Sequence, residues 1–133
     1  MSTLNVSNLK SKLASTPTKF YDKDDKEIGT LCRAWVNFNG TGTVAIRASF
    51  NVSSVTDNGA GDYTVNFTTA MPDANYSTTL GSKQNFDSNQ SAYDLTLAYG
   101  GVYSSTQVRL AFGVYNAGQV YADASTVCVA VFR

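Results

Sequence analysis

Apolar and polar residues alternate along most of the chain beyond residue 30, which is the pattern of strands with one buried face. The clearest run is 32–39, whose two faces carry Ala34, Val36 and Phe38 on one side and Arg33, Trp35 and Asn37 on the other. The run 43–56 predicts one long strand with a bulge or bend near Ser53 and Ser54. Its apolar face consists of Val44, Ile46, Ala48, Phe50 and Val52. Shorter alternating runs follow at 63–69, 76–80, 93–99 and 108–114.

Turn-forming residues separate these runs, and no run has a helical period. Asn39-Gly-Thr-Gly42 is a strong hairpin signal, because Asn and Gly tolerate the positive φ of tight turns. Further reversals are expected at 57–62, at Pro72-Asp73 and at 116–118. Together they predict an all-β fold, an antiparallel β-sandwich of about seven to eight strands. The final run, 126–133, is apolar on both sides, which favours a central strand covered on both faces.

Residues 1–30 differ from the rest of the chain. They hold most of the lysines and the charged run from Lys19 to Glu27, and their hydrophobic periodicity is weak, with at most a short strand at 4–9. We interpret 1–30 as an N-terminal arm for attachment and oligomerisation, and 31–133 as the compact β-sandwich domain. The acidic residues within the charged run predict a solvated turn better than a calcium site, because two lysines interrupt them and the spacing of a calcium-binding loop is missing.

Composition removes several classes of function. The 133 residues include no histidine, which excludes histidine-based catalysis and histidine-ligated metal sites. The formal net charge of zero argues against a nucleic-acid partner. The start of the chain does not resemble a secretory signal, and no apolar run is long enough to span a membrane, so no membrane insertion is expected. Two cysteines are too few for a zinc site; we expect Cys32 and Cys128 to be packed free thiols, with a disulfide as the alternative.

No catalytic residue, metal site or cofactor is predicted. Glycoside cleavage needs two carboxyl groups held across a cleft, and the candidate pairs are Asp57 with Asp62 and Asp87 with Asp94. Both pairs include turn or loop positions, where aspartate ordinarily caps its own backbone. A non-enzymatic protein is therefore the better interpretation.

Aromatic residues are the candidates for recognition. A set of rings lies among small polar residues, a composition typical of binding surfaces: Phe86, Tyr99, Tyr103, Tyr115 and Tyr121. The alternative is that these rings pack within the sandwich or at a subunit contact. Arg33 and Trp35 are candidates for a subunit interface, because they place large side chains on the face opposite the core-facing residues of their strand.

The run from Cys32 to Tyr76, which contains Trp35-Val-Asn-Phe-Asn-Gly-Thr-Gly42 and Asp57-Asn-Gly-Ala-Gly-Asp-Tyr63, resembles a segment of tailed-bacteriophage tail-fibre and related virion proteins. The closing Val129-Ala-Val-Phe-Arg133 is similar to the C-terminal strand of that family. The resemblance implies a β-sandwich at the tip of a homotrimeric fibre, located in the virion after synthesis in the bacterial cytoplasm and used for host attachment rather than catalysis.

On that basis, the expected function is a small tail fibre that contacts a glycan or protein of the host surface through the loops 83–92, 99–106 and 115–125. The arm is expected to bind other virion proteins. One alternative is a purely structural baseplate, neck or capsid decoration protein without receptor binding. A glycan-cleaving enzyme is the third reading, and it depends on the aspartate pairs.

Overall fold

The computed structural model describes residues 19–83, 94–98, 103–115 and 119–133, with the side chains of 94, 95, 114, 115 and 119 outside the description. Every regular element in these residues is a β-strand. The chain divides into two compact units, Met1–Leu31 and Cys32–Arg133. We describe each unit by itself.

The first unit contains a two-stranded antiparallel hairpin, β1 (Lys19–Tyr21) and β2 (Glu27–Thr30). Its turn is held by Asp22, whose Oδ1 accepts hydrogen bonds from the backbone nitrogens of Asp24 at 2.9 Å and Lys26 at 3.0 Å. The acidic part of the charged run, residues 22–26, is therefore a turn, as predicted, but the strands on either side of it were not predicted. The suggested strand at 4–9 lies outside the described residues.

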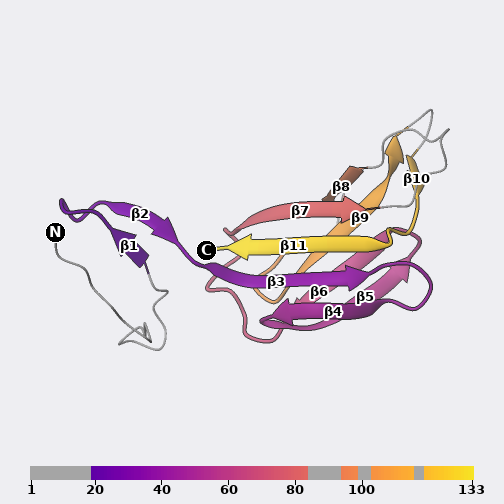
Figure 1. Cartoon of the computed structure of the whole chain (residues 1–133), viewed down its shortest axis with the longest axis horizontal. Helices are drawn as coiled ribbons and strands as arrows, with labels where there is room; N and C mark the ends of the chain where they lie inside the picture. The colour runs from indigo at the N-terminus through magenta and orange to yellow at the C-terminus, as the bar shows by residue number, and fades with distance from the viewer. Residues whose placement is uncertain (1–18, 84–93, 99–102, 116–118) are drawn as a thin grey trace. The chain divides into compact units, whose positions relative to one another are not determined.

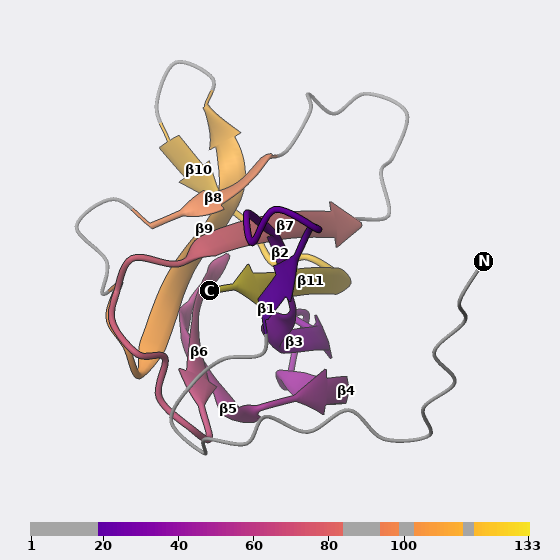
Figure 2. The same cartoon turned by 90° about the vertical axis from the view of Figure 1, so that its left-hand side faces the viewer.

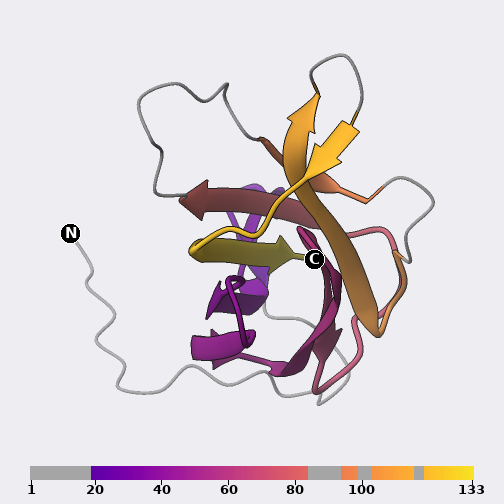
Figure 3. The same ribbon diagram turned by 90° about the vertical axis from the view of Figure 1, so that its right-hand side faces the viewer.

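The second unit is an antiparallel β-sandwich, so the predicted fold class is confirmed. One sheet has the order β4-β3-β11-β7, and Figure 1 shows it in front. The other has the order β10-β9-β6-β5, with β8 also paired to β9. Figures 2 and 3 view the two layers from the sides. The described residues of this unit form nine strands: β3 (Cys32–Asn39), β4 (Ala45–Phe50), β5 (Val52–Gly59), β6 (Asp62–Phe67), β7 (Ser77–Lys83), β8 (Asp94–Leu97), β9 (Gln107–Tyr115), β10 (Gln119–Tyr121) and β11 (Thr126–Phe132).

The predicted single strand over 43–56 is wrong, because the chain changes sheets at Asn51. This residue has φ 55°, a left-handed conformation that asparagine tolerates better than most residues. Its Nδ2 donates to the carbonyl oxygens of Arg33 and Thr69, both at 3.0 Å, and its Oδ1 accepts from the Thr69 nitrogen at 2.7 Å. These bonds fix the crossing point, two residues before the expected bend.

A bulge inside β4 breaks the predicted alternation as well. Asn37 pairs with Ala48 and Phe38 with Ile46, so Arg47 is an extra residue on β4. Phe50 consequently pairs with Trp35 on the side of the sheet away from the core. Within the predicted apolar face, only Val44 and Val52 pack against the core, whereas Ile46, Ala48 and Phe50 are exposed.

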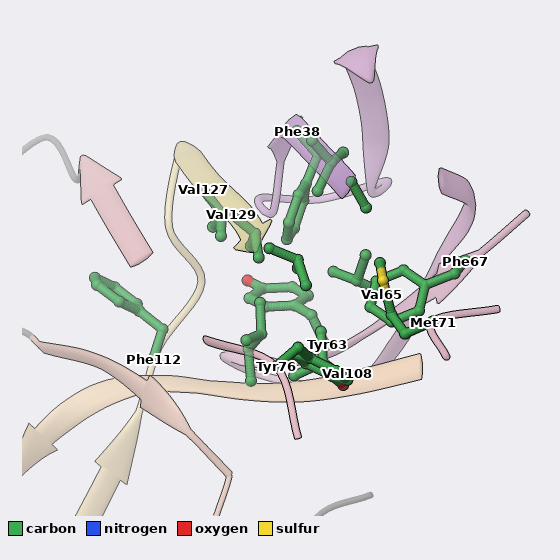
Figure 4. Close-up of a cluster of buried hydrophobic side chains, with 14 of the residues drawn as sticks. Phe38, Tyr63, Val65, Phe67, Met71, Tyr76, Val108, Phe112, Val127 and Val129 are labelled. Carbon is green, nitrogen blue, oxygen red and sulfur yellow. The ribbon is translucent and has the colours of Figure 1, made fainter. Parts of the chain in front are cut away.

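The core lies between the two sheets and draws on both (Figure 4). Strands β3 and β11 contribute Ala34, Val36, Phe38, Val127, Val129 and Val131, and strands β6 and β9 contribute Tyr63, Val65, Phe67, Val108, Leu110 and Phe112. Phe38 and Tyr63 meet edge to face across the layers, with ring centroids 5.2 Å apart. Strand β11 is central in its sheet, as predicted, but its outer side chain Cys128 is exposed, so the expectation of cover on both faces is wrong for this chain.

One buried hydroxyl joins three connections. The Tyr63 hydroxyl lies 3.1 Å from the Gly40 carbonyl oxygen and 3.1 Å from Oδ1 of Asp123, and it accepts from the Ala124 nitrogen at 3.4 Å. The same Asp123 oxygen accepts from the Gly61 nitrogen at 2.8 Å. The β3–β4, β5–β6 and β10–β11 connections are thereby tied together.

The sandwich has two distinct ends. At one end, which we call the near end, Phe132 pairs with both Cys32 and Ser77, so the unit begins and finishes there (Figure 1). At the opposite end, which we call the far end, Thr126 pairs with Lys83, and the three connections bonded to Tyr63 and Asp123 meet. Strands β9 and β10 also extend to this end.

Candidate functional site

The exposed side of the β4-β3-β11-β7 sheet, which we call the outer face, is the strongest candidate. Paired residues on neighbouring strands share a side, so the pairs Phe50–Trp35, Trp35–Ala130 and Ala130–Thr79 form one row across it. Trp35 is 40% exposed, Phe50 56% and Phe132 36%. Large apolar side chains thus gather on a face that the sandwich itself does not cover.

A hollow of about 330 Å³ lies on this face beside Trp35. Its lining is Trp35, Thr79, Leu80, Gly81, Cys128, Val129 and Ala130, none of them charged. Gly81 keeps the hollow open, because it has no side chain and the atom nearest to a Cβ placed there is Cys128 Cβ at 3.8 Å. The lining is therefore suited to an apolar side chain.

The arginine that crosses the outer face is held against the sheet. Arg47 Nη2 donates to the Ser125 carbonyl oxygen at 2.6 Å, and Nη1 donates to the Phe38 carbonyl oxygen at 3.1 Å. A third bond, at 3.3 Å, reaches Thr126 Oγ1. A fourth, also at 3.3 Å, reaches Asn37 Oδ1, so the guanidinium is bonded along the outer face between β3 and the start of β11.

In the other sheet, the outer side of β5, β6 and β9 is polar and internally bonded, whereas β8 and β10 carry the exposed Leu97, Val120 and Tyr121. Arg109 pairs with Asp62, its Nε donating to Oδ1 at 2.8 Å, and this hydrogen bond lowers the pKa of the Asp62 carboxyl. Asn66 Nδ2 donates to Thr56 Oγ1 at 3.0 Å, and Asn58 Nδ2 donates to Thr64 Oγ1 at 2.8 Å. Such a face is well suited to water. The outer face combines exposed aromatic side chains with an uncharged hollow, which makes it the stronger candidate for a contact surface.

The predicted interface residues occupy different positions. Trp35 is at the centre of the outer face, walling the hollow. Arg33 is half-buried at a shift in the β3–β11 register, between the Val131 and Phe132 pairs, and its carbonyl oxygen binds Asn51.

The structure does not bring the predicted recognition aromatics together. Tyr121 is 42% exposed on β10 toward the far end. Tyr103 is partly buried toward the near end, stacked on Tyr76 with ring centroids 4.3 Å apart and donating its hydroxyl proton to the Tyr76 carbonyl oxygen. Phe86 and Tyr99 lie outside the described residues, as does the side chain of Tyr115.

The described aspartates have structural roles. Asp57 Oδ1 accepts from the Gly59 nitrogen at 2.9 Å, so it caps its own turn as expected, while Asp62 is paired with Arg109. Asp87 and the Asp94 side chain lie outside the described residues. In the part of the chain that the structure describes, no three metal-binding side chains of His, Cys, Asp or Glu come together.

Both cysteines are free thiols, as predicted. Cys32 is half-buried and donates to the Ala34 carbonyl oxygen at 3.2 Å. Cys128, however, is exposed on the outer face beside the hollow, so the prediction that it is packed is wrong. The apolar strand around it has one side in the core and the other on the outer face.

Sequence reasoning missed Phe50 and Gly81 as parts of this face. Asn51 was the available signal for Phe50, since an asparagine that follows an apolar run can turn the chain and end the alternation. Gly81 carries no such signal, because the depth of the hollow depends on the strand that lies beside it.

No helix among the residues described is both long and apolar enough to cross a membrane. Comparisons of the chain with protein-family models, with curated proteins and with solved structures find no match.

Proposed function

We propose that this protein is a non-catalytic structural protein of a bacteriophage virion, a small homotrimeric tail fibre that contacts the host cell surface. The observation that carries the proposal is the apolar outer face centred on Trp35, which combines exposed aromatic side chains with an uncharged hollow. Exposed apolar surface of this kind is characteristic of an assembly contact. The resemblance of residues 32–76 and 129–133 to tail-fibre proteins supplies the kind of assembly.

The arrangement of the sandwich ends supports a role in attachment. The domain begins and finishes at the near end, where Cys32 and Phe132 pair, so the arm that precedes it is assigned to binding other virion proteins. The far end carries the exposed Tyr121 and the tied connections around Gly40 and Gly61. We assign contact with a host glycan or protein to this end, and Tyr103 to packing at the near end.

The proposal is tested on the particles whose genome encodes the chain. An antibody against the sandwich should label the tails of these particles in electron micrographs. The purified full-length protein should bind the bacteria that they infect and reduce particle adsorption. Tyr121→Ser should weaken this binding, whereas Leu97→Ser is the control, because Leu97 is exposed on β8 of the same sheet but lies outside the loops assigned to host contact.

Absence of the protein from the particles overturns the proposal. If it is present but an assembled wild-type protein neither binds the cells nor blocks adsorption, the attachment role is wrong. In that case the alternative holds, a baseplate, neck or capsid decoration protein that uses the same outer face only for assembly. Release of sugar fragments from host polysaccharide would instead identify an enzyme.

A further inference from the structure

We infer that copies of this chain interlock through their outer faces, with Phe50 of one copy inserted into the hollow beside Trp35 of another. The inference rests on the homo-oligomer of the proposed function and adds the contact that builds it. It does not depend on any host receptor.

Phe50 has the position of an inserting side chain. It is the last residue of β4, it pairs with Trp35 on the outer face, and it is 56% exposed. The bulge at Arg47 and the turn at Asn51 hold it there from both sides. A ring held on fixed backbone loses little conformational entropy on binding.

The hollow has the complementary form. Gly81 and Ala130 supply a floor of small residues and Trp35 supplies an aromatic wall, against which a second ring can pack. Its lining has no charge that an apolar ring would leave unpaired, and the nearby Arg47 is not part of the lining and already has partners in the sheet.

A second copy is the occupant that these features select. The inserting ring and the hollow lie on the same face, on opposite sides of Trp35, so each copy offers both halves of the contact. Repeating such a contact can close a ring of copies, which is compatible with a trimer.

The exposed aromatic area accounts for part of such a contact. Given that a buried aromatic side chain covers about 150–250 Å², the exposed parts of Trp35, Phe50 and Phe132 amount to roughly 250 Å². A stable interface needs about 800 Å² from each partner. Three side chains therefore supply about a third of it, and the small residues around the hollow belong to the same surface.

The test compares two variants of the full-length chain by sedimentation over a range of concentrations. Gly81→Val places a side chain in the hollow, where the nearest atom to the new Cβ is 3.8 Å away and the glycine has no positive φ. Phe50→Ser removes the ring. Each should weaken self-association by at least ~10-fold while the chain stays folded. Val120→Ser is the control for Phe50→Ser, since Val120 is 57% exposed on the other sheet, and it should leave self-association unchanged.

Mixing the two variants tests the pairing itself. Phe50→Ser keeps the hollow and Gly81→Val keeps the ring, so an equal mixture should form a two-chain species that neither variant forms alone. A wild-type protein that sediments as a 14.3 kDa monomer overturns the inference, as does a Gly81→Val variant that assembles like wild type. An assembled wild type that fails to bind host cells contradicts the attachment role only, so the two failures are distinguishable.

Discussion

Replacing Tyr63 by phenylalanine measures how much one buried hydroxyl stabilises the far end of the sandwich. The hydroxyl lies 3.1 Å from both the Gly40 carbonyl oxygen and Asp123 Oδ1, and the Ala124 nitrogen donates to it at 3.4 Å. Phenylalanine keeps the ring but leaves the Gly40 and Ala124 groups without this partner. We expect the free energy of unfolding at pH 7 to fall by about 1–3 kcal/mol.

The loss should shrink in alkali. Burial raises the pKa of Tyr63 well above the ordinary tyrosine value, so the folded protein keeps this proton where the unfolded chain releases it. The stability from Tyr63 is complete below pH ~10 and falls as the pH rises above it, by about 1.4 kcal/mol per pH unit. The variant has no such proton. The difference in stability between wild type and Tyr63→Phe should therefore close about one to two pH units above pH 10.

Urea unfolding of both proteins at a series of pH values from neutral to strongly alkaline measures this difference directly. Other titrating groups affect both proteins alike and cancel in the comparison. Tyr121→Phe is the control, because it removes the hydroxyl of an exposed tyrosine and should not change stability. A difference between wild type and Tyr63→Phe that is negligible at pH 7, or that stays constant in alkali, refutes the argument.

Three further predictions concern other parts of the sandwich. Asn51→Ala should lower the free energy of unfolding in urea by about 2–4 kcal/mol, because it loses three hydrogen bonds and strains a positive φ, while Asn51→Gly should lose less. The bond from Arg109 lowers the pKa of Asp62, so this pair stabilises the fold above pH ~4 and the stability is lost as the pH falls. In Asp62→Asn, the drop in the free energy of unfolding between neutral and acid pH should be smaller than in wild type, by less than about 1 kcal/mol. An unchanged dependence of unfolding on acid pH counts against the pair. In a Cys32→Ser background, Cys128 should react with a thiol reagent several-fold more slowly in the assembled protein than after dilution, and equal rates contradict its place in the interface.

The fold class was predictable because it depends on local signals. Alternation in 32–39 and the turn residues that follow determine a sandwich without knowledge of any partner strand. The register of β4 was not predictable in the same way. Its bulge at Arg47 is defined by pairing with β3, and side-chain bonds far along the chain hold Asn51 in its conformation. The two strands of the N-terminal hairpin were missed because their charged and apolar residues do not alternate.

The candidate site was predictable in part for the same reason. Trp35 could be assigned to the face opposite the core from its own strand alone. Phe50 and Cys128 share that face only because β4 and β11 both flank β3, which is a matter of topology. The two-sided apolar pattern of β11 predicted cover on both faces, but only one of its faces is covered within the chain, because Cys128 on the outer face is exposed.

The bonds around Tyr63 have a practical consequence for engineering. They hold the base of the β3–β4 connection at Gly40 and leave the residues just beyond it, Thr41 to Thr43, exposed to solvent. A foreign peptide inserted between Thr41 and Gly42 would begin next to a residue, Gly40, whose position is held by its hydrogen bond with Tyr63. The β3–β4 connection is thus a suitable graft site for displaying short peptides, because the bonds at Gly40 lie outside the inserted segment.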